Sequence, residues 1–385
     1  MPALSAPPRA HLAPQAVHDL VHADDLEVAG FGADLLDTTD QVIGDLTPHL
    51  RSGSVTWDGA VDLHRSCELV VDRELAWGRD RLRVHQTLTS ALVGITATFW
   101  LGVFVLTRPT FAADGSDVVE HQVKGWDKTY LLRSPVADTW ATRWVESGQA
   151  TTVGAEVRRV LRGAGYTGAV ALAPEVETTF LPEPMVWPLD EKTSWLRVAN
   201  DVLGAGAFTG LWADEAGVLR ADPLTPLEER PVELVLDADD ARTTLLGPVR
   251  TRTQDLAEVP NSWRFINTLL EGEPLPGQGI YDPPDNESDG LTSIAARGYR
   301  LRRPVKVEAA DQDALVRIGN ERVAADRRAA GGRALTTAPL PLLGHRTHVQ
   351  LVDAAHGPPA RALVTRWGPL DLAGADVPVT VEEVA

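Results

Sequence analysis

The hydrophobic pattern of this 385-residue chain changes twice along its length, and each change restricts the folds open to it. Residues 41–150 contain short apolar runs separated by Gly, Asp and Ser, a spacing typical of an antiparallel barrel or sandwich. Residues 151–230 show helical periodicity, and short strand-like runs return over residues 231–385. The sequence therefore predicts an α+β protein: two tube-like antiparallel β-barrel or sandwich domains with an intervening small α/β domain. Residues 1–40, which begin with a Pro-rich stretch, are predicted to form an N-terminal arm.

The middle region is predicted to contain two amphipathic helices and a hairpin. In the first helix the apolar residues recur at i, i+4, i+7 and i+8 from Val153. The second helix follows a Thr-Ser pair at 193–194, which supplies its N-cap, and ends at Gly204. Residues 214–217 then turn two strands of a hairpin.

Three glycines in the same region have the spacing of a dinucleotide-binding fingerprint. Gly163, Gly165 and Gly168 read G-x-G-x-x-G. The fingerprint requires a strand before the glycines and a helix after them, so that helix amides face a pyrophosphate. Here the predicted helix precedes them and a strand follows. We interpret them as a helix C-cap at Gly163 and a tight turn, and we expect no cofactor.

Charge and cysteine content narrow the possible functions. The chain carries 54 acidic and 36 basic residues, a formal charge of −18, which disfavours adhesion to nucleic acid or anionic membranes. The single cysteine, Cys67, excludes an internal disulfide and is predicted to be a small core residue. The most apolar run, residues 91–106, is shorter than a membrane-spanning helix, and we predict buried strands broken near Gly94 or Gly102.

The last third of the chain adds one helix and one long loop to the predicted strands. The helix is expected near 311–329, and the Pro- and acid-rich stretch 271–290 is expected to be a loop. Five tryptophans are candidates for core or interface positions, with the core favoured because large aromatics are mostly buried. They are Trp57, Trp100, Trp126, Trp263 and Trp367.

Catalytic and metal-binding patterns are weak. His18 and His22 stand four residues apart, as in a zinc hydrolase, but Asp19 replaces the longer Glu and no third ligand has suitable spacing. His345 and His348 are a weaker pair at a loop-to-strand junction. Four acids in the long loop could ligate calcium, although solvated loop residues are the favoured interpretation; they are Asp282, Asp285, Glu287 and Asp289. We therefore expect a protein that is not an enzyme.

The middle region resembles that of tail hub (baseplate hub) proteins of tailed bacteriophages and phage-tail-like particles. The stretches that carry the resemblance are "TSWLRVANDVLGAG", preceded by a Pro-containing linker, and the hairpin "LWADEAGVLRADP". The resemblance covers roughly residues 40–385 and is strongest in the middle. Its main motif positions, which are also candidate interface residues, are Trp187, Ser194, Leu196, Asn200, Trp212, Asp214, Gly217 and Arg220.

The resemblance implies a structural virion protein at the distal end of the tail, a minor tail protein of a siphophage type. Three copies would form a ring that presents six barrels to a six-fold tail tube. The expected partners are further copies of the chain, the tail tube or distal tail ring, the tape-measure protein and central fibre or receptor-binding proteins. DNA would pass through the lumen without sequence-specific binding, and acidic residues on the inner wall would keep it from adhering.

Two other interpretations stay open. One is the equivalent hub of a contractile injection system or tail-like particle, which neighbouring genes would distinguish. The other is a tail-associated hydrolase that uses either the His18–His22 pair or a set of acidic residues that the sequence does not reveal. Metal analysis and peptidoglycan turnover would test it. Because the chain ends at Ala385 without a lytic or receptor-binding extension, we expect those activities to reside elsewhere.

Overall fold

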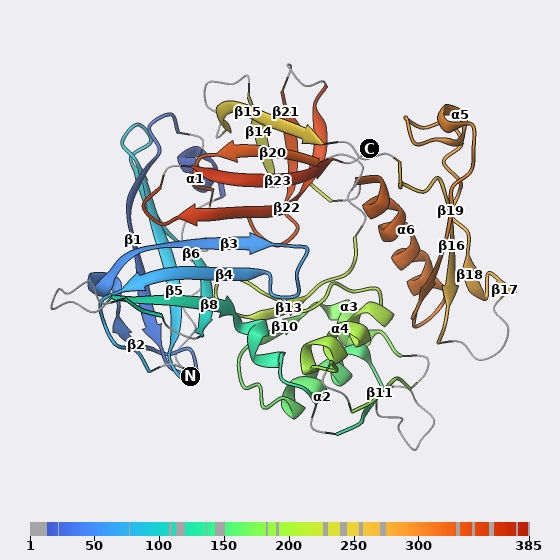
Figure 1. The fold of residues 1–385 in the computed structure, drawn as a ribbon, viewed down its shortest axis with the longest axis horizontal. Coiled ribbons are helices and arrows are strands. Elements are labelled where there is room, and N and C mark those ends of the chain that lie inside the picture. The colour runs from blue at the N-terminus through green and yellow to red at the C-terminus, as the bar shows by residue number, and fades with distance from the viewer. Residues whose placement is uncertain are drawn as a thin grey trace.

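A computed structural model describes most of the chain (Figure 1). The described residues are 14–21, 23–76, 78–107, 110–112, 120–136, 138–142, 151–181, 184–189, 192–225, 230–238, 245–253, 257–269, 275–328, 332–340, 343–353, 358–374 and 376–383. Within these ranges no helix combines the length and the hydropathy needed to cross a lipid bilayer.

The largest element is a 14-stranded, mainly antiparallel sheet to which both β-rich regions contribute, counted over the described residues. Its main path runs β15 (Leu245–Thr253), β20 (Gly332–Thr337), β23 (Val377–Glu383), β22 (Ala360–Asp371), β3 (Leu50–Asp58), β4 (Arg65–Val71), β8 (Glu120–Asp127), β6 (Ile95–Leu106), β5 (Arg81–Ser90), β1 (Glu27–Leu36) and β2 (Val42–Asp45). Beside this path, β14 (Leu234–Asp237) pairs with β21 (His348–Val352), β21 also pairs with β22, and β7 (Thr110–Ala112) pairs with β8.

The join between the two β-rich regions is the pairing of β22 with β3, where Trp367 lies opposite Trp57. Strand β22 is long enough to pair with β21 and β23 along its first part and with β3 along its last part. One hydrophobic core contains residues of both regions, including Val55, Trp57, Val364 and Trp367. The two β-rich regions therefore share a sheet and a core. The finer prediction, two tube-like barrels, stays a proposal.

The intervening α/β region forms its own layer below this sheet in Figure 1. It consists of α2 (Val153–Gly163), α3 (Pro174–Thr178), α4 (Trp195–Ala205), a sheet of β10 (Val170–Leu172), β13 (Leu219–Ala221) and β12 (Trp212–Ala213), and the pair β9 (Trp140–Ala141) with β11 (Val186–Trp187). Thr152 and Ser194 cap α2 and α4, as their positions predict. Gly165, with φ of 72°, supplies the left-handed turn after α2, two residues later than expected.

Residues 257–328 form an α+β unit with its own sheet, and the division that assigns residues 231–385 to a second β-domain with one helix stays a prediction. Strands β17 (Leu275–Pro276), β18 (Gly279–Tyr281), β16 (Ser262–Asn267) and β19 (Arg302–Val307) make a four-stranded sheet. Helix α6 (Gln312–Arg328) covers one face of it and forms a small core with Trp263 and Phe265. A short helix, α5 (Ile294–Arg297), follows the loop after β18. The predicted loop 271–290 therefore contains two short strands.

The N-terminal prediction differs from the structure as well. Strand β1, at residues 27–36, pairs along its length with β5 and is a full member of the large sheet. Helix α1 (Pro14–Val21) buries Val17 and Leu20 against Leu88 and Phe99. The stretch before residue 40 is therefore not only an extended arm.

Several local predictions are confirmed. Cys67 is buried in the main core, and the apolar run 91–106 begins as a turn that ends at Gly94, where φ is 69°, and continues as the single strand β6. Trp57, Trp263 and Trp367 are at most 4% exposed, whereas Trp100 and Trp126 are only half-buried. The large aromatics with the deepest burial thus mark the cores.

Candidate functional site

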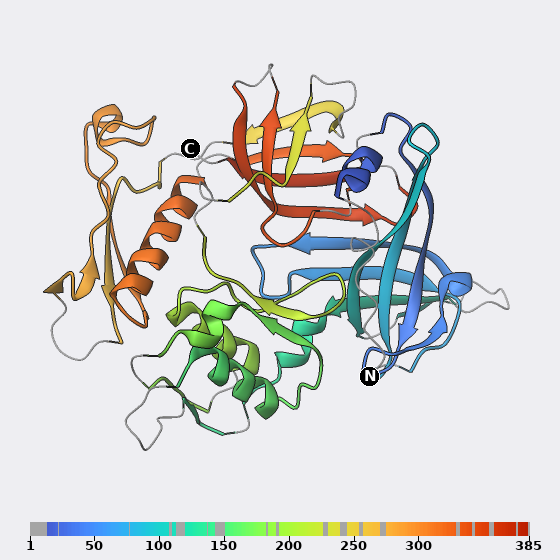
Figure 2. The same cartoon turned by 180° about the vertical axis from the view of Figure 1, so that it is seen from behind.

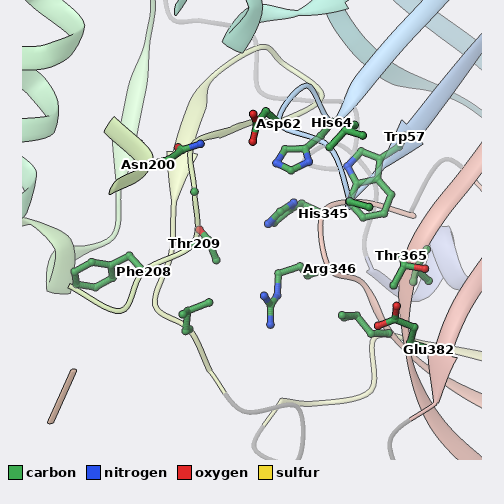
Figure 3. Close-up of a pocket in the computed structure, with 17 residues that line it drawn as sticks. Trp57, Asp62, His64, Asn200, Phe208, Thr209, His345, Arg346, Thr365 and Glu382 are labelled. Carbon is green, nitrogen blue, oxygen red and sulfur yellow. The ribbon is translucent and has the colours of Figure 1, made fainter. Parts of the chain in front are cut away.

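A cavity of about 430 Å³ lies where the large sheet meets the α/β layer (Figure 3). Strand β3 and the turn after it supply one wall, α4 and its following loop a second, and β22, β23 and the loop before β21 a third. The lining residues include Trp57, Asp62, His64, Asn200, Phe208, Thr209, His345, Arg346, Thr365 and Glu382. Segments far apart in the sequence therefore build this site jointly.

His345 is the central side chain of the junction. Its ring stacks on that of Trp212 of β12, with centroids 4.7 Å apart and an interplanar angle of 13°. The ring of His64 lies 5.1 Å away, and that of Trp57 lies 6.1 Å away, edge-on. Burial, with further contributions from His64 and Arg346, lowers the pKa of His345 to about 2. The imidazole is therefore neutral and packs as an aromatic ring between the layers.

Arg346 extends the junction to the α6 unit. Its guanidinium donates to Glu321 of α6 at 2.7 Å. The backbone amide of Ala310 donates to Ala205 O, at the end of α4, at 2.6 Å. A smaller cavity of about 180 Å³ shares Thr209, His345 and Arg346 with the first one. Residues 345 and 346 thus contact the large sheet, the α/β layer and the α6 unit.

The β12–β13 turn is the second contact between the layers. The guanidinium of Arg65 of β4, only 1% exposed, donates to Glu215 at 2.6 Å. Asp214 closes the turn, because its carboxylate accepts from the backbone amides of Ala216 and Val218 at 3.0 and 2.9 Å. This hairpin therefore docks through a buried ion pair on the large sheet.

Lys128 is a second buried cation that packs against the same hairpin, at Gly217. Its ammonium is 1% exposed and lies 2.5 Å from Asp40, which also accepts from Arg81 at 2.8 Å. The ammonium also lies 5.7 Å from the centre of the Tyr166 ring of the α/β layer. Burial lowers the pKa of Lys128 and raises that of Tyr166. A Cβ at Gly217 would lie 2.7 Å from Val103 and 2.8 Å from Lys128, so a glycine is needed there.

The predicted motif residues lie together in the α/β layer. The indole of Trp187 donates to Asp201 at 2.8 Å, and that of Trp212 donates to Asp222 at 3.0 Å. Asn200 accepts from the amide of Leu211 at 2.9 Å, and Leu196 is buried. The Asn200 contact joins α4 to the hairpin, and the Trp187 contact joins β11 to α4.

The remaining motif residues stabilise the two ends of the same structure. Arg220 donates to Asp214 at 2.7 Å, and Ser194 caps α4 through the amide of Arg197 at 3.2 Å. Their observed contacts are thus internal, and a role at a subunit interface stays a prediction.

The weaker metal-binding candidates have other surroundings in the structure. His18 is 60% exposed beside Asp19, and His22 lies outside the described residues. Asp282 is bound by Arg264 and Arg302, and Arg300 lies 3.0 Å from Asp285 and 3.7 Å from Glu287. His348 is buried, with Nδ1 3.1 Å from the Arg230 and Pro231 carbonyls. Across the described ranges, no group of three or more His, Cys, Asp or Glu residues is placed to hold a metal.

Sequence reasoning missed four of the residues that connect the layers, namely Arg65, Lys128, Glu215 and His64, and considered His345 only as a weak metal ligand. One signal was present: Arg65 is in phase with the inward-facing Cys67, Leu69 and Val71 of β4. A charged residue at an inward position indicates a buried partner. Nothing local to His345 indicates that a tryptophan more than a hundred residues away stacks on it.

The fold is one that solved structures of prophage and bacterial tail proteins share. A tail protein from Neisseria meningitidis aligns with 92% of this chain and 97% of its own, at 14% identity and a TM-score of 0.58. The 43 kDa tail protein of prophage MuSo2 from Shewanella oneidensis aligns with 91% of this chain and 98% of its own, at 13% identity and a TM-score of 0.58. The prophage tail protein gp18 from Listeria monocytogenes aligns with 91% of this chain and 94% of its own, at 8% identity and a TM-score of 0.52. No protein-family model and no curated protein matches the sequence.

Proposed function

We propose that this chain is a structural tail protein that forms the hub at the distal end of a phage tail. The observation that carries the proposal is the fold, which extends over more than nine tenths of this chain and of each tail protein named above. The buried contacts between its layers support it, because a part that transmits load in a tail must hold its domains in fixed relative positions. The sequence motifs of the middle region agree with the same role.

In this proposal three copies close into a ring at the end of the tail tube. Each copy contributes two β-rich parts, so the ring offers six similar surfaces to a six-fold tube. The ring forms a channel for DNA and the tape-measure protein, and it binds a distal tail ring and central fibre or receptor-binding proteins. The proposed role of the motif residues is to hold the α/β layer together where it packs below the shared sheet of the two β-rich parts.

The native mass of the purified protein tests the ring. We expect about 125 kDa, three times the chain mass of 41.5 kDa, in sedimentation equilibrium. Electron microscopy of particles should then show three copies beneath a six-fold tube. A protein that stays at one copy over the whole accessible concentration range contradicts the proposal.

A second test concerns the wall of the channel. We propose that acidic residues outnumber basic residues on it, since the chain has a formal charge of −18 and lysines or arginines would hold passing phosphates. A ring structure with a basic channel would overturn this part.

The hub of a contractile injection system is the alternative, and the proposed ring geometry is the same for both. Sheath and ATPase genes beside this gene would favour the injection system, whereas capsid and terminase genes would favour a phage tail.

A further inference from the structure

The sheet of the α6 unit leaves one of its faces uncovered. Trp263 and Arg303 both bind Asp326 of α6, so their strands β16 and β19 turn these side chains toward the helix. Side chains alternate along a strand, and neighbours in register share a face. The register pairs Arg264 with Pro304 and Ile266 with Lys306, so these four face away from α6. In Figures 1 and 2, α6 lies between this sheet and the rest of the molecule.

This outward face combines an apolar centre with positive charge. Ile266 and Ile280 are half-buried and adjacent in register, and Pro304 is exposed. Arg264 and Arg302, 38% and 46% exposed, share the carboxylate of Asp282, and Lys306 is exposed. We call the face formed by Arg264, Ile266, Ile280, Asp282, Arg302, Pro304 and Lys306 the basic sheet face, because its bases outnumber its one acid. Glu308 is the first acidic residue after Lys306 in the sequence. It lies past the end of β19, near Arg197 and Asp201 of α4.

The opposite end of the molecule has a surface of complementary character. Strand β2 is the last strand on its end of the large sheet path and pairs with β1. Val42 and Ile43 of this strand are 55% and 51% exposed. Asp37 and Asp45 flank them and supply the acidic charge, whereas Asp40 between them is already paired with Arg81 and Lys128. We call residues 37–45 the acidic β2 edge.

These two surfaces lie at opposite ends of the longest axis of the molecule, which is horizontal in Figures 1 and 2. Two different, complementary patches on one chain generate a head-to-tail contact, and such a contact closes into a ring when the rotation between copies permits. An exposed apolar centre rimmed by charge is also the composition expected of a protein interface.

We propose that the basic sheet face of one copy binds the acidic β2 edge of the next copy. The occupant is a second copy of this chain, because the β2 edge presents acidic residues beside the exposed side chains of Val42 and Ile43, and the basic sheet face presents bases beside partly exposed apolar side chains. This inference rests on the proposed ring and assigns the surfaces that close it.

Paired variants test the contact by native mass over a dilution series. Lys306→Glu adds repulsion on one surface and Ile43→Lys on the other, and each should raise the concentration at which the oligomer dissociates by about tenfold or more. The double variant Lys306→Glu with Ile43→Lys restores opposite charges and should recover most of that loss. Arg162→Glu on α2 and Leu92→Lys in the β5–β6 turn make the same chemical changes at exposed sites elsewhere and should have no effect.

The outcomes separate this contact from the proposed function. Assembled wild type together with unchanged assembly of both single variants overturns the contact and leaves the hub proposal standing. A wild type that never exceeds one copy overturns both. If Lys306→Glu abolishes binding of a duplex DNA oligonucleotide while the mass is unchanged, the basic sheet face binds a polyanion and the contact is again wrong. Unfolding temperatures of all variants establish that each one is folded.

Discussion

His345, Arg65 and Lys128 are ionisable side chains at the junctions between the layers, and each is stabilised differently. His345 is neutral and stacks on Trp212, whereas Arg65 and Lys128 lie within ion-pair distance of the carboxylates of Glu215 and Asp40. A buried charge without its partner is strongly unfavourable, so each pair ties one layer to another. The same chemistry makes these positions sensitive to pH and to substitution.

The depressed pKa of His345 predicts that acid destabilises the fold. An unfolded histidine takes up a proton below about pH 6.5, whereas the folded one resists it down to about pH 2. Stability from this residue is therefore complete above pH 6.5 and is lost progressively as the pH falls toward 2. We expect a loss on the order of 1 kcal/mol at about pH 5.5.

Urea unfolding of the wild type and of His345→Gln at about pH 8 and pH 5.5 measures this loss. The variant lacks the titrating group, so its free energy of unfolding should change less between the two pH values. His85 and His348 also have lowered pKa values and titrate in both proteins, so the difference between the two proteins isolates His345. Equal pH dependence in both would contradict the prediction.

Removal of Glu215 should be costly because it leaves the Arg65 guanidinium buried and uncompensated. We expect Glu215→Ala to lower the free energy of unfolding by about 3 kcal/mol. Glu177→Ala breaks the exposed ion pair with Arg158 and should cost less than about 1 kcal/mol. Urea titration of both variants gives the comparison, and similar small costs would show that the Arg65 contact is unimportant.

Among the elements, the β12–β13 hairpin connects the α/β layer to the large sheet. Its turn must bring backbone close to Val103 and Lys128, which requires a residue without a side chain and with positive φ. Gly217 has φ of 76° and Gly165, after α2, has φ of 72°, but a Cβ at Gly165 would meet nothing within 4 Å. The two glycines thus share a backbone conformation and differ in packing.

This pair separates backbone strain from close packing. Gly165→Ala should cost about 1 kcal/mol, from the left-handed conformation alone. Gly217→Ala should cost at least about 1 kcal/mol more, because the added methyl displaces the hairpin from the sheet. The measurement is the midpoint of urea unfolding for each variant, and equal costs would mean that the hairpin has room to move.

Elements whose signals are local could be predicted well from the sequence. The α2 and α4 helices, the hairpin turn, and the helix at 312–328 follow from caps and apolar periodicity within a dozen residues. Strand β1 was assigned to an arm because its place depends on pairing with β5, more than forty residues later. The sequence does not distinguish the strands of the small sheet, at residues 262–307, from those of the large sheet. A strand-like run does not show which sheet the strand will join.

At the scale of the whole molecule, the β22–β3 pairing makes the first and last regions of the chain one body. The α6 unit has its own small core instead and contacts the rest through α4 and Arg346. A unit with a small core opens more readily than a sheet that spans the molecule. The hierarchy of stability should therefore follow the cores.

Hydrogen exchange followed by mass spectrometry should show this hierarchy. We expect peptides from β3 and β22 to exchange at similar slow rates, because their shared core opens as one unit. Peptides from β16 and β19 should exchange at least about tenfold faster. Slow exchange of β16 and β19 together with fast exchange of β22 would contradict this assignment.

The sequence by itself determined the mixed α+β class and the three longer helices α2, α4 and α6, because apolar periodicity and N-caps depend on neighbours within one or two turns. It also placed Trp57, Trp263 and Trp367 correctly in cores, since large apolar area is buried wherever it stands. Only the tertiary structure decided that the outer regions share one sheet, that residues 257–328 form a unit with its own sheet, and that His345, Arg65 and Glu215 meet partners across layers. Those contacts join residues distant in sequence, and no local pattern encodes which distant strand or ring will be opposite.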